Sequence, residues 1–154
     1  MLLARNLGLT KSAEVSAKSN SLHILSFSNP DVSVFTVKRD IVKPAELSSA
    51  CSLLVDHINT RMKAKEKFTI IADIDELGII EPTEETFNAI RKIGDAVTAL
   101  GCTPYISGAF FYTNNNLTAG MLTMAVNSLF KPPISVRIST NYKDLKINIS
   151  NCAS

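Results

Sequence analysis

Apolar runs and amphipathic stretches alternate along most of the chain. Leu22–Ser28 and Val32–Lys38 are rich in β-branched and aromatic residues, and the Asn-Pro-Asp sequence at positions 29–31 between them is typical of a turn. Two such runs one turn apart predict a β-hairpin. Phe68–Ile74 is apolar almost without interruption, which is typical of a central strand that is covered on both faces of a sheet.

Apolar residues at helical spacing fill most of the intervals between these runs. Pro44 suits the first turn of a helix, and apolar residues recur after it every three or four positions as far as Met62. The remaining predicted elements are helices from Pro82–Thr83 to Leu100, over Leu117–Phe130 and over Asn141–Ile149, and strands at Thr103–Ser107 and Ile134–Ile138. A hairpin followed by alternating helices and strands predicts an α/β fold, a mixed sheet with helices packed on it.

The length of 154 residues is that of one domain, and 45% hydrophobic against 19% charged residues is enough apolar material for a core. We expect a single domain over residues 22–149. Residues 1–21 are small, polar and weakly basic, which predicts a flexible tail or a short helix at the edge of the domain. Residues 150–154 are expected to form a C-terminal tail.

Three features bear on where the chain acts and on what. Its cysteines (Cys51, Cys102 and Cys152) are odd in number and widely spaced, which fits a reducing compartment and favours the cytoplasm. The apolar pair Leu2–Leu3 is too short for a secretory signal, and no run is long and apolar enough for a membrane span. The net charge of +2 and the short basic run at 61–67, which fits a solvated helix end, predict no nucleic-acid partner.

The order of the predicted elements resembles that of STAS domains, the family of sulfate-transporter and anti-sigma-factor-antagonist domains, over roughly Leu22 to Ile149. The resemblance includes the Phe68–Ile74 strand, the segment 75–85 that follows it, and the helix that ends at Ala99–Gly101. It implies a STAS-like α/β fold and a regulatory module that acts through protein–protein interaction.

Members of that family follow the equivalent strand with an acidic residue, two hydroxyl residues, glycine and leucine, and the first hydroxyl is the usual phosphoacceptor. On this sequence the motif falls on residues 81–85, where Glu81 keeps the acid, Pro82 stands at the phosphoacceptor position, Thr83 keeps the second hydroxyl and Glu84 replaces the glycine. The resemblance therefore makes Thr83 the candidate phosphorylation site. The alternative is that Thr83 simply begins a helix.

The segment from Asp73 to Glu85 holds six carboxylates and no lysine or arginine. We interpret Asp75, Glu76 and Glu81 as an anionic edge that recognises a protein partner. Two alternatives remain open at this point: carboxylates in the first turn stabilise the N-terminus of a helix, and clustered oxygen ligands suit a divalent cation. Of these, we do not predict a metal site.

No charged residue or histidine occurs in the 35 residues from Ala96 to Phe130, where an average composition would supply roughly nine charged residues. A helix in this region that carries no charge on its outer face is covered by a partner, lines an apolar cavity, or lies wholly within the domain. The residues assigned to this contact surface or ligand pocket are Phe110, Phe111, Met121, Leu122 and Met124.

The chain shows no catalytic motif. A nucleophile elbow, a dinucleotide-binding glycine loop and a phosphate-binding loop are all missing from the sequence, and its two histidines, His23 and His57, fit structural or exposed positions. We therefore predict no enzymatic activity, no catalytic residue and no cofactor. A receiver-like domain with Asp73 as phosphoacceptor and Lys131-Pro132 beside it fits less well, because only a turn separates the first two strands.

The predicted function is that of a non-enzymatic signalling module in the cytoplasm. It binds a protein partner, most simply a second copy of itself in a homodimer, through the uncharged region 109–130. The alternative function is that of a carrier for a lipid or another apolar ligand, since some STAS-related folds contain a hydrophobic pocket.

Overall fold

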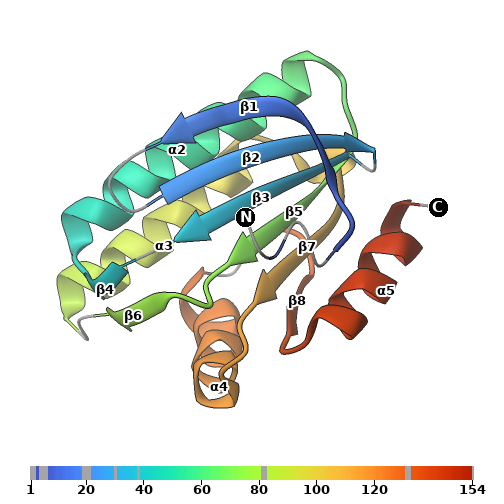
Figure 1. The fold of residues 1–154 in the computed structure, drawn as a ribbon. Helices are drawn as coiled ribbons and strands as arrows, with labels where there is room; N and C mark the ends of the chain where they lie inside the picture. The colour runs from blue at the N-terminus through green and yellow to red at the C-terminus, as the bar shows by residue number, and fades with distance from the viewer. Residues whose placement is uncertain are drawn as a thin grey trace.

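The computed structural model describes residues 3, 7–18, 22–29, 31–37, 39–80, 83–130 and 133–153. Its strands are β1 (Thr10–Lys18), β2 (Leu22–Asn29), β3 (Asp31–Val37), β4 (Arg39–Val42), β5 (Phe68–Asp73), β6 (Leu77–Ile80), β7 (Ile106–Tyr112) and β8 (Val136–Ser139). Its helices are α2 (Pro44–Lys63), α3 (Glu84–Ala99), the 3₁₀ turn η1 (Thr103–Tyr105), α4 (Asn116–Ala125), the π-helical turn η2 (Val126–Phe130) and α5 (Tyr142–Ala153). Their arrangement is shown in Figure 1.

Six of these strands form one mixed sheet in the order β1-β2-β3-β5-β7-β8. The pairs β1–β2 and β2–β3 are antiparallel, whereas β3, β5, β7 and β8 run parallel to one another. Parallel neighbours need crossover connections, and α2, α3 and α4 supply them. The prediction of an α/β fold with an N-terminal hairpin, a mixed sheet and packed helices is confirmed.

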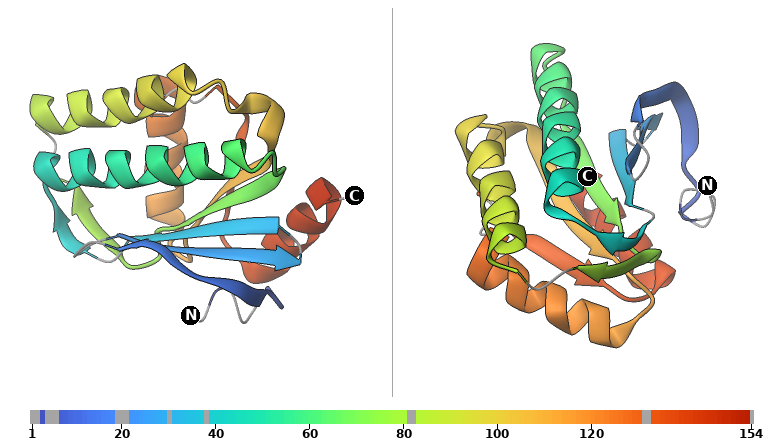
Figure 2. Two further views of the ribbon diagram at one scale, coloured as in Figure 1. Left: turned by 90° about the horizontal axis from the view of Figure 1, so that it is seen from above. Right: turned by 90° about the vertical axis from the view of Figure 1, so that its left-hand side faces the viewer.

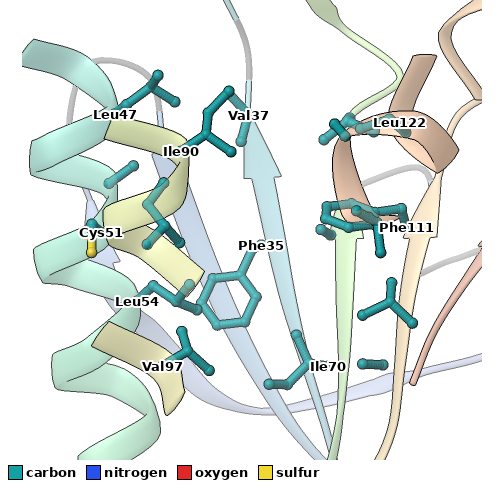
Figure 3. Close-up of a pocket in the computed structure, with 18 of the residues that line it drawn as sticks. Phe35, Val37, Leu47, Cys51, Leu54, Ile70, Ile90, Val97, Phe111 and Leu122 are labelled. Carbon is teal, nitrogen blue, oxygen red and sulfur yellow. The ribbon is translucent and has the colours of Figure 1, made fainter. Parts of the chain in front are cut away.

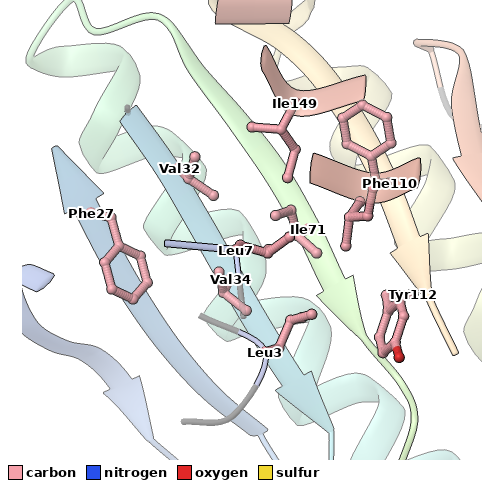
Figure 4. Packing of buried hydrophobic residues seen from close by; sticks show 10 residues of the cluster. Leu3, Leu7, Phe27, Val32, Val34, Ile71, Phe110, Tyr112 and Ile149 are labelled. Carbon is pink, nitrogen blue, oxygen red and sulfur yellow. The ribbon is translucent and has the colours of Figure 1, made fainter. Parts of the chain in front are cut away.

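The helices cover both faces of this sheet. Helices α2 and α3 lie side by side on one face, and α5 lies against the other (Figure 2). Because side chains alternate along a strand, Val32 and Val34 of β3 pack toward the α5 side and Phe35 packs toward α2. The cluster on the α5 side (Figure 4) consists of Leu3, Leu7, Phe27, Val32, Val34, Ile71, Phe110, Tyr112, Leu145 and Ile149.

The N-terminal segment is part of the domain, and the prediction of a flexible tail or short helix over residues 1–21 is wrong for the part that the structure describes. Strand β1 pairs with β2 along the edge of the sheet, and Leu3 and Leu7 are buried in the core. Residues 10–18 carry few large apolar side chains, so their pattern signals no strand. Pairing at a sheet edge is made by the backbone, which that pattern does not report.

Two further boundaries differ from the prediction. Helix α5 continues to Ala153, so residues 150–153 are helical rather than a tail, and Cys152 packs against the core cluster. The strand expected at Thr103–Ser107 lies instead at Ile106–Tyr112, because the segment that contains Pro104 forms the η1 turn first. This shift places all three consecutive aromatic residues of the chain, 110–112, inside β7.

A second, small sheet was not predicted. Strands β4 and β6 pair in parallel, with Ile41 opposite Ile79, and they lie beside the beginning of α2 and α3 (Figure 1). Strand β6 occupies the middle of the segment that the sequence presents as an acidic loop. The apolar residues 77–80 within that segment are therefore a short strand between two acidic turns.

Candidate functional site

A cavity of about 260 Å³ lies between the sheet and the helices on the α2 side, and it is partly open to the surface. Strands β3, β5 and β7 form its floor, and α2, α3 and α4 form its walls (Figure 3). The residues that line it are Phe35, Val37, Glu46, Leu47, Ala50, Cys51, Leu54, Ile58, Ile70, Ala72, Ile74, Leu77, Ile90, Ile93, Val97, Ala109, Phe110, Phe111, Leu122, Ala125, Val126, Ile134 and Val136.

The floor of the cavity follows from the alternation of the strands. Ile70 and Ala72 of β5 and Ala109 and Phe111 of β7 are two residues apart, so each pair lies on the same face of the sheet. Two of these four are alanines, which leave space beneath the helices that a larger side chain would fill. Phe111 rises from this floor toward Leu122 of α4 (Figure 3).

Helix α4 closes one side of the cavity. Asn115 caps its N-terminus, since the side-chain oxygen of Asn115 accepts hydrogen bonds from the backbone N–H groups of Leu117 and Thr118. Leu122 and Ala125, together with Val126 of the π-helical turn η2, line the cavity. The turn η2 packs against α3. Because η2 follows directly after α4, this contact holds the C-terminal end of α4 against the wall that α3 forms.

The lining is almost wholly apolar. Among the described residues that line the cavity, Glu46 in the first turn of α2 is the only charged one. Cys51 follows five residues later on the same helix, and burial raises the pKa of its thiol, which keeps it protonated at neutral pH. The cavity therefore offers dispersion contacts and almost no polar surface, and Glu46 borders it mainly with the hydrocarbon part of its side chain.

The five residues predicted as a contact surface or ligand pocket divide into two groups. Phe111 and Leu122 line the cavity, and Phe110 also borders it although its ring packs in the cluster on the α5 side (Figure 4). Met121 and Met124 point away from it and are 62% and 71% exposed. The uncharged helix α4 thus has two different faces: one lines the cavity, and the other is exposed apolar surface.

Most of the lining residues were not identified from the sequence as a site. Leu47, Cys51, Leu54 and Ile58 form the apolar stripe of α2, which the helical spacing marks only as core-facing. A cavity is a deficit of volume between elements, and no pattern along one element records it. The alanines at 50, 72, 109 and 125 are the one signal in the sequence that could have pointed to it.

The predicted partner-binding acidic loop lies away from the cavity. Asp75 and Glu76 are exposed, and Glu81 lies outside the described residues. The Asp75 carboxylate accepts a hydrogen bond from the backbone N–H of Asn114, across a distance of 2.6 Å, so it joins the turn after β5 to the turn after β7. Asp75 thus has a role in holding the fold whether or not a partner binds there.

Thr83, the candidate phosphorylation site, is exposed and forms the N-cap of α3. Its hydroxyl accepts a hydrogen bond from the Thr86 backbone N–H at 3.2 Å and contacts the Thr86 hydroxyl at 3.0 Å. This is the helix-start position that the sequence allowed as the alternative. Glu84 and Glu85 occupy the first turn that follows, as carboxylates at a helix N-terminus commonly do.

The receiver-like arrangement cannot be assembled from the described residues. Asp73 is the last residue of β5, but Lys131 and Pro132 lie outside the described residues. The first two of the predicted strands, β2 and β3, pair antiparallel through a turn, as the hairpin prediction requires.

A buried polar cluster lies on the same side of the sheet as the cavity but separate from it. The Ser33 hydroxyl and Nε2 of His57 are 2.7 Å apart and hydrogen-bonded, and both residues are buried. Burial, and next the charge of Arg61, lowers the pKa of His57 from 6.5 to about 4. Neither Ser33 nor His57 lines the cavity, and their hydrogen bond joins α2 to β3.

Arg61 belongs to this cluster, and the expectation that it sits at a solvated helix end is wrong. Its guanidinium is buried, donates hydrogen bonds to the backbone oxygens of Phe27 and Val32, and pairs with Glu66 at 3.0 Å. It also lies over the ring of Phe68, 4.9 Å from the ring centre. Lys63, like the rest of the basic run, is exposed.

Within the described part of the chain, no helix combines the length and the apolar character that crossing a bilayer requires. The same residues contain no group of three or more histidine, cysteine or carboxylate side chains placed to hold a metal ion. Comparison of the chain with models of known protein families, with characterised proteins and with solved structures finds no match.

Proposed function

We propose that this protein binds a small apolar molecule in the cavity between its sheet and helices α2, α3 and α4, and acts as its carrier. The observation that carries the proposal is the cavity itself, about 260 Å³ in volume with one charged residue among the described residues that line it. Ligand sites are typically concave and mostly apolar, with few polar groups. An apolar cavity of about 150 Å³ is enough to bind benzene.

Scaling from that example, the cavity accommodates roughly ten carbon atoms. Burying such a molecule removes apolar surface from water, which favours binding by about 25 cal/mol for each Å². The strand order, an antiparallel hairpin followed by parallel strands, also supports a STAS-like fold, in which the sequence resemblance allows a hydrophobic pocket. The three free cysteines support action in a reducing compartment such as the cytoplasm.

Naphthalene, which has ten carbon atoms and no polar group, provides the test of this function. In a titration followed by methyl NMR, we expect the resonances of Ile70, Ile93 and Leu122 to shift saturably, while Ile147 of α5, which is 52% exposed and far from the lining, does not shift. Ala125→Phe fills the cavity from α4 and should weaken binding at least tenfold.

Ala45→Phe is the matched control, because Ala45 is exposed on α2 and does not line the cavity. This variant should bind naphthalene like the wild type. The proposal is wrong if naphthalene shifts none of the lining methyl groups, or if Ala125→Phe folds and binds it undiminished. Native mass spectrometry of freshly purified protein adds a second readout, a co-purified apolar mass.

The outer face of α4 favours a second function, self-association of a regulatory module. Leu117, Met121 and Met124 are 75%, 62% and 71% exposed, on a helix that has no charged residue. Apolar surface of this kind tends to mark interaction sites, and methionine adapts to irregular contacts. We propose a second copy of the chain as the occupant, since a face without charge can meet its own copy without like-charge repulsion.

Light scattering over a concentration series tests this second function. The wild type should show a dimer at high concentration, and Met121→Glu should remain a monomer with unchanged thermal stability because Met121 is exposed. Ile147→Glu, at an exposed apolar residue on α5, is the control and should still dimerise. A wild-type protein that stays monomeric throughout the series rules the proposal out.

A further inference from the structure

Gly120 lies in the middle of α4 and is exposed. A glycine inside a helix destabilises that helix relative to alanine. The backbone of Gly120 is helical, and, apart from its chain neighbours and the surrounding helix backbone, no described atom lies within 4 Å of the position that a Cβ atom would take. Over the residues that the structure describes, neither the backbone conformation nor the internal packing therefore requires a glycine here.

Three large exposed apolar side chains lie on the same face of α4 as this glycine, those of Leu117, Met121 and Met124. At 3.6 residues per turn, Leu117 and Met124 lie along the midline of the face. Gly120 and Met121 lie on opposite sides of this midline, about 100° apart around the helix axis. The face therefore has no side chain on one side of its midline and a large, flexible one on the other side, at nearly the same height.

Two copies of this face can meet in two ways. When the two helices run parallel, the left side of one faces the right side of the other, so Met121 of each copy lies against Gly120 of the other. Leu117 and Met124 then each meet the same residue of the second copy. When the helices run antiparallel, left faces left, so the two Met121 side chains meet on one side and the two glycines leave a void on the other. The parallel arrangement is the one that fills the space beside each glycine, as close packing requires.

We infer that α4 packs in parallel against α4 of a second copy of the chain, and that Gly120 forms the hollow that receives Met121 of that copy. This inference rests on the proposed self-association. A twofold-symmetric contact needs a surface that is complementary to itself, and the pairing of Gly120 with Met121 supplies that complementarity. Helix α4 carries no charged residue, so the contact brings no like charges together.

Replacing Leu117, Met121 or Met124 by cysteine, one at a time, tests the direction of the pair under mild oxidation. All three residues are exposed, so the three variants should fold alike. In the parallel arrangement the Leu117→Cys and Met124→Cys variants should form disulfide-linked dimers, and the Met121→Cys variant should not. The antiparallel arrangement reverses this result, because residue 117 then lies about 10 Å along the axis from its counterpart, too far for a disulfide. The wild type under the same conditions gives the background from the native cysteines.

Gly120→Met tests the hollow, because it places a large side chain where Met121 of the second copy lies. It should weaken dimerisation by about tenfold or more in light scattering over a concentration series. The double variant Gly120→Met with Met121→Gly exchanges the hollow and the side chain that fills it, and should restore dimerisation to within about threefold of the wild type. Thr123→Met, at an exposed residue of α4 outside this face, is the matched control and should dimerise like the wild type.

The outcomes separate this inference from the self-association on which it rests. A wild type that stays monomeric contradicts both. If the wild type dimerises but the Leu117→Cys and Met124→Cys variants form no disulfide beyond the background, the parallel pairing is wrong and self-association stands. The inference is equally wrong if Gly120→Met folds and dimerises as tightly as the wild type. The cysteine series leaves Gly120 in place, so it decides the pairing even if Gly120→Met does not fold.

Discussion

Replacing Arg61 by alanine is expected to lower the free energy of unfolding by about 3 kcal/mol or more. The buried guanidinium donates to the backbone oxygens of Phe27 and Val32, which lie on either side of the hairpin turn between β2 and β3. It also packs over the ring of Phe68. Alanine removes two charge-assisted hydrogen bonds and leaves a void between α2 and the sheet, and both effects destabilise the folded state.

Urea unfolding of matched variants measures this loss. Arg61→Lys keeps the charge but not the planar fork of donors, so its loss should fall between those of the wild type and Arg61→Ala. Glu66→Gln should cost less than about 1 kcal/mol, since the Glu66 side chain is 45% exposed and the ion pair is screened by water. Arg91→Ala, at an exposed residue of α3, should change the free energy of unfolding little. A loss for Arg61→Ala no larger than that for Arg91→Ala would contradict the assignment.

Acidification is expected to destabilise the protein by about 3 kcal/mol between pH 6.5 and pH 4 through His57 alone. The pKa of His57 is lowered to about 4 in the folded protein by burial and by Arg61, whereas the unfolded chain has the ordinary value of 6.5. Between these two values the unfolded state binds a proton that the folded state does not bind. The stabilisation is therefore complete above pH 6.5 and is lost as the pH falls through about 4.

The free energy of unfolding at a series of pH values checks this prediction. Carboxylates also titrate in the lower part of the range, so the quantity to compare is the difference between the wild type and His57→Gln. That variant should be less stable at pH 7 and should have a shallower dependence on pH. His23→Gln removes the other histidine of the chain. The assignment to His57 is refuted if His23→Gln flattens the profile and His57→Gln leaves it as steep as before.

These two predictions concern stability, and the two proposals concern binding, because the structure keeps the groups apart. Ser33, His57 and Arg61 join α2 to the sheet and do not line the cavity. Variants at Arg61 and His57 should therefore act on folding, while Ala125→Phe should act on ligand affinity. If the variants at Arg61 and His57 also changed ligand affinity, access to the cavity would depend on loosening the contact between α2 and the sheet.

The sequence by itself determined the class of fold. The hairpin at residues 22–37, the buried strand at 68–73 and the helix from Pro44 were all predicted from apolar periodicity. Each of these elements buries a continuous face, and the spacing of apolar residues is the direct record of which face that is. Thr83 was likewise placed at a helix start by its residue type, because a hydroxyl there accepts from a free backbone N–H.

The lack of charge from Ala96 to Phe130 identified an unusual region but did not say what it contacts. Only the tertiary structure decided that Leu122 lines a cavity while Met121 is exposed. The two residues are adjacent in sequence, but they lie on different faces of α4. Likewise, only the fold buried Arg61, whose place at the end of a helix is typical of a solvated cation. A cavity and a buried charge both depend on what lies opposite a residue in space. That neighbour comes from another element, and its position is not encoded in the local pattern.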